Sequence, residues 1–120
     1  MDPVTGLSFG RIIIGIGSIV SPKLTARLFG LSPQANPHLG YFERMFGVRE
    51  IALGTLTLMA KGPARQTMIV AGMAVDGGDA ATGAIGLVRK DVPKLAGVLL
   101  TVVALGAVGS GAQALKDARG

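Results

Sequence analysis

Seven ionisable side chains lie inside otherwise apolar stretches of this sequence, and their types are those that pair with one another. Away from water, a charge without a partner costs several kcal/mol, so buried charges are expected in groups that neutralise each other. Four negative charges stand against three positive ones, which is close to the balance that pairing requires. The seven residues are Arg11, Glu43, Arg44, Arg49, Glu50, Asp76 and Asp79.

All the basic members of this group are arginines, whereas the lysines fall in the segments that connect the apolar stretches. A guanidinium group can form two parallel hydrogen bonds with one carboxylate, which a lysine ammonium cannot do. We therefore expect Arg44 and Arg49 to bridge to Asp76, Asp79 or Glu50, with the helices that carry them face to face.

The carboxylates outnumber the arginines, and the excess group has two chemical uses. It would be held protonated by burial and by a like-charged neighbour, ready for acid–base catalysis, or it would bind a cationic or hydroxylated ligand. A purely structural role, in which the cluster only locks helix packing, is the alternative. The candidate acid–base residues are Asp76, Asp79 and Glu50, and the candidate ligand-binding residues are Arg11, Glu43, Arg44 and Arg49.

Helical periodicity places these charges on faces that are rich in small residues. At about 100° per residue, a first strip about 40° wide holds Glu43, Gly47, Glu50, Gly54 and Thr57. A second strip about 60° wide holds Gly72, Asp76, Asp79 and Gly83. A third face holds Ser8, Arg11, Gly15 and Ser18. Arg11 either points with these small polar residues or extends its head group to an aqueous interface.

The elements that carry these faces are long and apolar. The chain has 120 residues, of which 49% are hydrophobic and only 16% charged, against about 25% charged in soluble proteins. Four apolar segments run over about 4–20, 41–60, 66–88 and 95–115, each long enough or nearly long enough to cross a bilayer. The sequence predicts a single all-α domain over residues 1–120, a bundle of four transmembrane helices. Gly6-x-x-x-Gly10 is a literal motif for close packing between such helices.

The segment between the first two apolar stretches has a different character. Lys23, Leu24, Arg27 and Leu28 form an amphipathic pattern after Pro22, and prolines follow at 33 and 37. We expect a short interfacial helix and then an irregular loop. An extension of the first helix is the alternative.

Composition excludes several classes of site. There is no cysteine and only one histidine, His38, so neither thiolate chemistry nor a two-histidine metal site is expected, and we predict no cofactor. The net charge of +5 comes largely from basic residues between or beyond the apolar segments, which favours anionic lipid headgroups over nucleic acid.

We expect a multi-pass protein of the inner (plasma) membrane with a retained first helix, because Met1-Asp2-Pro3 has no basic region and no cleavage site follows Ile12–Val20. The basic loops favour neither orientation, so dual insertion and an antiparallel dimer stay open. A soluble helical bundle is the structural alternative, but it offers no wet face for Leu95–Leu115.

The run Arg44-x-Phe46-Gly47-Val48-Arg49-Glu50-Ile51-Ala52-Leu53-Gly54, with the later Asp76-x-x-Asp79-Ala80, resembles a family of small four-helix integral membrane proteins of unknown function. Pro22 and the Phe29-Gly30-Leu31 turn extend this resemblance over most of the chain. The family is frequent in actinobacteria and also occurs in fungi. The resemblance implies the fold and a membrane location, and it implies no activity.

Three classes of function fit these observations. The first is a membrane protein whose polar cleft binds a lipid or small amphiphilic ligand, alone, as a homo-oligomer or as a subunit of a larger membrane complex. The second is a membrane enzyme that uses its carboxylates on a lipid or isoprenoid, as an isomerase, cyclase or epoxide-opening enzyme. The third is a proton-coupled small transporter.

Overall fold

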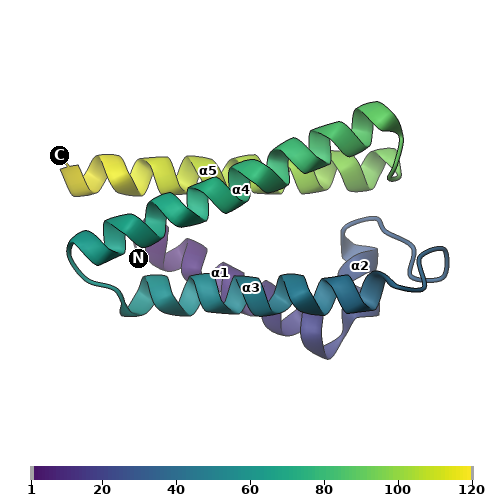
Figure 1. Ribbon diagram of the computed structural model, residues 1–120, viewed down its shortest axis with the longest axis horizontal. Helices are drawn as coiled ribbons and strands as arrows, with labels where there is room; N and C mark the ends of the chain where they lie inside the picture. The colour runs from purple at the N-terminus through teal and green to yellow at the C-terminus, as the bar shows by residue number, and fades with distance from the viewer. Residues whose placement is uncertain (1, 120) are drawn as a thin grey trace.

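A computed structural model describes residues 2–119 and the side chains of residues 2–117. This part of the chain is all-α and contains no strand, as predicted. Each of the four apolar segments coincides with a long helix, and the short helix expected after the first segment is present. Figure 1 shows α1 (Pro3–Val20), α2 (Pro22–Leu28), α3 (Leu39–Met59), α4 (Pro63–Arg89) and α5 (Lys94–Arg119).

Local chemistry sets the helix ends. Asp2 caps α1 by accepting a hydrogen bond of 2.8 Å from the backbone N–H of Thr5. This hydrogen bond holds the pKa of Asp2 below its ordinary value, and Nη2 of Arg65, which lies 3.3 Å from Oδ1 of Asp2, acts in the same direction. Gly62, with a φ of 60°, turns the chain between α3 and α4, and Pro63 begins α4 where its missing N–H is harmless.

The helices form two antiparallel pairs, α1 with α3 and α4 with α5 (Figure 1). The backbones of α1 and α3 lie very close together because glycines face the neighbouring backbone. A Cβ atom on Gly47 would lie 2.6 Å from the backbone oxygen of Gly15, and one on Gly54 would lie 2.6 Å from the backbone oxygen of Ser8. Small residues at this spacing allow the approach that membrane helices use in place of large interlocking side chains.

The α4–α5 pair uses the same device. A Cβ atom on Gly83 would lie 2.5 Å from the hydroxyl of Thr101, and one on Gly97 would lie 2.5 Å from the side chain of Leu87. By contrast, Gly10 of the predicted Gly6-x-x-x-Gly10 motif has open space around it. The close packing of α1 therefore does not come from that motif.

The two pairs meet at their ends and diverge between them. At one end Val4, Ile69 and Ala114 form a small apolar cluster that joins α1, α4 and α5. At the other end Gly30 has a φ of 77° and lies against Leu95 and Ala96 at the start of α5. Contacts between α1 and α5, and between α3 and α4, are sparse compared with those inside each pair.

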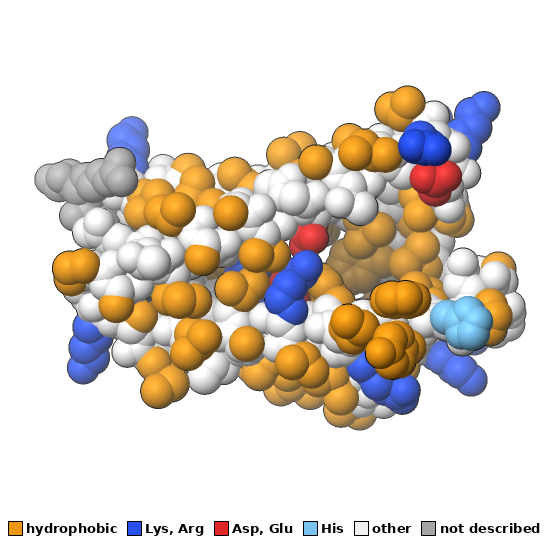
Figure 2. Space-filling view, in the orientation of Figure 1, with side chains coloured by type: hydrophobic (Ala, Val, Ile, Leu, Met, Phe, Trp, Pro, Cys, Tyr) orange, Lys and Arg blue, Asp and Glu red, His pale blue; other side chains and the backbone are white. Residues whose placement is uncertain are grey.

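The interior and the outer surface have an unusual division of residue types. Buried positions are mostly alanine, glycine and polar residues, and the largest fully buried side chains in the described part are Ser8 and Ser18. Large apolar side chains are instead exposed on the outer faces of the long helices, for example Ile13 of α1, Val48 of α3 and Val88 of α4. Figure 2 shows such side chains spread over one face of the molecule.

Two helices, α1 and the Lys94–Asp117 part of α5, are long and apolar enough to cross a membrane. α3 and α4 have the length, but they carry the charged side chains of the predicted cluster within them. By length and composition the structure therefore supports two of the four predicted spans. α4 is helical throughout, including at the consecutive glycines Gly77 and Gly78.

The close approach of α1 and α3 generates a prediction about Gly47 and Gly54. Gly47→Ala and Gly54→Ala should each destabilise the fold by about 1–3 kcal/mol, because the new methyl group meets backbone that cannot move aside alone. Gly109→Ala is the matched control. A Cβ atom there meets nothing within 4 Å, so this change should stabilise the helix by up to about 1 kcal/mol. The measurement is the midpoint of unfolding in detergent micelles, and equal stabilisation by all three alanines would show that the α1–α3 contact is not close.

Candidate functional site

The charged side chains meet between the two helix pairs because glycines let their helices approach. On α1, Arg11 lies between Ser8 and Gly15, the two positions where the backbone of α3 comes closest. Opposite it on α3, Glu50 lies between Gly47 and Gly54. Gly72 of α4 leaves room for the guanidinium group, since a Cβ atom there would lie 3.1 Å from Nη2 of Arg11.

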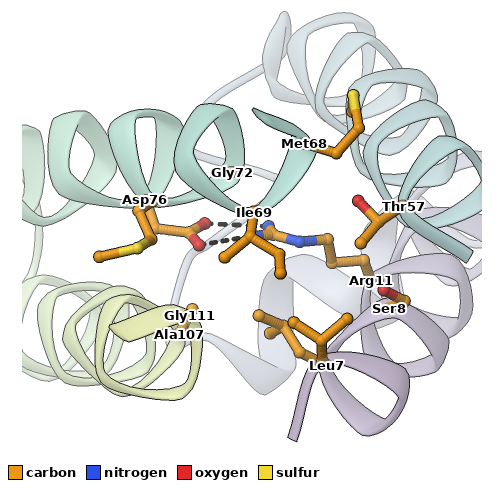
Figure 3. A pocket seen from close by; sticks show the side chains of 12 residues that line it. Leu7, Ser8, Arg11, Thr57, Met68, Ile69, Gly72, Asp76, Ala107 and Gly111 are labelled. Carbon is orange, nitrogen blue, oxygen red and sulfur yellow. Dashed lines mark hydrogen bonds and ion pairs between the residues drawn. The ribbon is translucent and has the colours of Figure 1, made fainter. Parts of the chain in front are cut away.

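Arg11 joins three helices. Its Nη1 donates hydrogen bonds of 2.9 Å to Oε2 of Glu50 and to Oδ1 of Asp76, and its Nη2 pairs with Oδ2 of Asp76. Figure 3 shows the side chain of Arg11 extending from α1 to the carboxylate of Asp76 on α4. These side chains are almost completely buried, with 7% exposure for Arg11 and 4% for each carboxylate residue. Of the two alternatives for Arg11, the structure shows the one in which it points inward with the small polar residues of α1.

Arg49 forms the second link between the pairs. Its Nη2 donates to Oδ2 of Asp79 at 2.7 Å and to Oε1 of Glu50 at 2.9 Å, and its Nη1 lies 3.3 Å from Oδ1 of Asp79. The guanidinium carbon also lies 5.0 Å from the ring centre of Phe46, within the range of a cation–π contact. The predicted bridging of Arg49 to Asp79 and Glu50 is confirmed.

We call Arg11, Arg49, Glu50, Asp76 and Asp79 the charge network. All six oxygens of its three carboxylates accept hydrogen bonds from the two guanidinium groups. The network carries one net negative charge if every member is ionised. Its inner part is buried, whereas the side chains of Arg49 and Asp79 are 36% and 38% exposed.

The predicted bridging role of Arg44 is wrong. Its Nε donates to the backbone oxygen of Ile19 at 3.4 Å, and the side chain lies on the exposed surface beside α1. The physical reason is geometric: Arg44 and Arg49 are about 140° apart around α3, so only one of them can face α4.

Glu43 is also outside the charge network, but it lies at the wall of a cavity. Its Oε2 atom is buried and has no hydrogen-bond partner among the described residues. Buried carboxylate oxygens normally have a partner, so this atom is chemically unsatisfied. The described residues contain no group of three or more His, Cys, Asp or Glu side chains placed to hold a metal ion.

A cavity of about 620 Å³ lies between the two helix pairs. Figure 2 shows the hollow between α4 above and α3 below, with hydrophobic walls and charged side chains at its edge. Most of the lining is apolar, and the charge network closes one side. The polar lining residues are Arg11, Ser18, Thr25, Glu43, Glu50, Asp76, Asp79, Thr82 and Ser110.

A second, much smaller cavity lies on the other side of Arg11. Its volume of about 10 Å³ is that of a single water molecule at most. Ser8, Thr57 and Gly72 line it, as Figure 3 shows, together with apolar side chains of α4 and α5. Arg11 therefore separates a tightly packed end of the molecule from the large cavity.

The sequence contained a signal for part of this arrangement. Arg11 shares its face with Ser8, Gly15 and Ser18, and all four are buried against α3 or α4. The contributions of α2 and α5 to the cavity, through residues such as Thr25 and Ala104, had no signal in the pattern of charges. They depend on how the two pairs sit against each other.

Comparisons with curated proteins and with solved structures give no match to this chain. A family model described as a domain of unknown function (DUF4267) matches residues 8–112. This range begins just before Arg11 and includes the whole charge network and all polar residues of the large cavity. The match agrees with the resemblance seen in the Arg44–Gly54 run. The chain belongs to the DUF4267 family.

Proposed function

We propose that this protein is a four-span integral membrane protein of the plasma (inner) membrane. The supporting observation is the division of residue types, with serine, glycine and charged groups inside and large apolar side chains outside. In water that arrangement would expose apolar surface on every long helix, whereas lipid tails are a suitable solvent for it. The charges of α3 and α4 are compatible with spanning, because the two arginines of the network compensate two of its three carboxylates inside the bundle.

α2 fits the interfacial position in this proposal. Its exposed residues include the apolar Leu24 and Leu28 and the basic Lys23 and Arg27. A short helix with both kinds of residue lies favourably among lipid headgroups. In that position it covers one end of the large cavity, which Thr25, Ala26 and Phe29 help to line.

We further propose that the protein binds a small amphiphile, a lipid or a lipid-like molecule, in the large cavity. The cavity carries this proposal, since its volume lies within the range of small-molecule sites, about 300–1,000 Å³. Its lining is mostly apolar and includes a few polar groups, which is the composition expected for a ligand with an apolar chain and a polar head. The gap between α3 and α4 gives such a ligand access from the lipid phase.

The catalytic and transport alternatives have no specific observation in their favour. Each oxygen of Glu50, Asp76 and Asp79 already accepts a hydrogen bond from a guanidinium group. A transporter also needs a path out of the opposite side, where Arg11 and the packed end block the way. Acid–base catalysis, proton coupling, an oligomer and a complex partner stay predictions.

The four-span topology predicts a labelling pattern that needs only single-cysteine variants, because the chain has no cysteine. Gln34→Cys, Lys61→Cys and Asp91→Cys all lie at exposed positions outside the long helices or next to their ends. With four spans, a membrane-impermeant maleimide should reach position 61 from one side of the membrane and positions 34 and 91 from the other. If only α1 and α5 span, all three positions should react from the same side.

Amphiphile binding predicts an effect of filling the cavity. Gly10 lines the cavity, and a Cβ atom there meets nothing within 4 Å, so Gly10→Phe adds a ring without a backbone clash. Binding of 1-dodecanol in phosphatidylcholine nanodiscs, measured by native mass spectrometry, should fall about tenfold or more. Gly109→Phe is the matched control, as Gly109 has the same open surroundings but does not line the cavity. An equal effect of both variants, or no effect of either, would contradict binding in this cavity.

A further inference from the structure

Many polar groups of the large cavity have hydrogen-bond partners within the protein. Nη1 and Nη2 of Arg11 donate to Glu50 and Asp76. The hydroxyls of Ser18, Thr25 and Thr82 donate to the backbone oxygens of residues 14, 21 and 78. The donors that a ligand could use are therefore largely occupied.

The acceptors of the cavity are not all occupied. Glu43 lines the cavity from α3, and its buried Oε2 atom has no hydrogen-bond partner among the described residues. Glu43 lies seven residues before Glu50, which corresponds to about 10 Å along the helix axis. This acceptor is therefore separate from the charge network and lies closer to the α2 end of the cavity.

The large cavity also has an excess of negatively charged side chains. Four carboxylates line the cavity, and the two guanidinium groups of the charge network compensate only two of them. If all are ionised, the site has two excess negative charges within mostly apolar walls. A group that brings a positive charge and N–H donors would satisfy both the unpaired oxygen and the excess charge.

We propose that the amphiphile is a protonated alkyl amine, whose ammonium group donates to Glu43 while its chain lies along the apolar wall formed by residues such as Leu100 and Val103. This inference rests on the proposed binding of an amphiphile in the cavity. An amine fits better than a bare metal ion, because Ca²⁺ and Mg²⁺ require about six oxygen ligands and Glu43 is a single carboxylate. An anionic headgroup would meet the excess negative charge of these carboxylates.

The test is a matched series of probes that differ only in the head group: 1-dodecylamine, 1-dodecanol and dodecanoate. Binding to the full chain in phosphatidylcholine nanodiscs is measured by native mass spectrometry. We expect the amine to bind more tightly than the alcohol by about ten- to a hundredfold, the range expected for a charge-assisted hydrogen bond, and dodecanoate to bind least. This comparison uses the wild-type chain, so it does not depend on the folding of a variant.

Glu43→Gln should then reduce amine binding to the level of the alcohol while leaving alcohol binding unchanged. Asp117→Asn is the charge-matched control, because Asp117 is exposed near the end of α5 and outside the cavity. It should preserve the preference for the amine.

The possible outcomes separate the two proposals. Alcohol binding that is sensitive to Gly10→Phe, without a preference for the amine, would overturn the amine assignment and leave amphiphile binding standing. A preference that survives Glu43→Gln, or that Asp117→Asn also abolishes, would overturn the role of Glu43. Insensitivity of every probe to Gly10→Phe would overturn the proposed function itself.

Discussion

The structure depends on one buried guanidinium group. Arg11 is almost fully enclosed, and it contacts a carboxylate from α3 and another from α4, so a single side chain holds three helices. Removing one partner of such a buried pair typically costs about 3–5 kcal/mol, because the remaining charge is left without compensation. The glycine contacts between α1 and α3 are a condition for this arrangement, since they bring Arg11 and Glu50 to the same level. The two helix pairs are then joined by Arg11 to Asp76 and by Arg49 to Asp79.

The same interactions shape the cavity. The charge network occupies the middle of the molecule and forms one wall of the cavity, and every oxygen of its three carboxylates accepts a hydrogen bond within the network. On one side of Arg11 the helices pack around Val4, Ile69 and Ala114, and on the other they diverge around a space of about 620 Å³. Glu43 is the carboxylate that this arrangement leaves with an unpaired oxygen. The unpaired acceptor at the cavity therefore belongs to a residue outside the charge network.

Much of this could be predicted from the sequence, because helical periodicity is a local property. The four long helices, the short helix after Ser21 and the faces that carry Gly47, Glu50 and Asp76 all follow from spacing and composition. Residue type also predicted that Arg49 pairs with a carboxylate of Glu50, Asp76 or Asp79, but it did not single out Asp79. Which flank of α3 faces α4 is a tertiary property, however, and the sequence could not distinguish Arg44 from Arg49 on that ground. The close packing expected at the motif of Gly6 and Gly10 was wrong for the same reason. Gly10 lines the cavity, and the close contacts are made by Gly15, Gly47 and Gly54.

A double-mutant cycle between Arg11 and Asp76 would show whether these two side chains hold the two helix pairs together. Arg11→Met alone leaves Asp76 buried without a hydrogen-bond partner among the described residues, whereas Asp76→Leu alone leaves Arg11 paired with Glu50. We predict that the double variant unfolds in detergent at a higher midpoint than the Arg11→Met variant, with a coupling free energy of about 1 kcal/mol or more. Strictly additive destabilisation would contradict the claim that these two side chains meet in the interior and join the helix pairs.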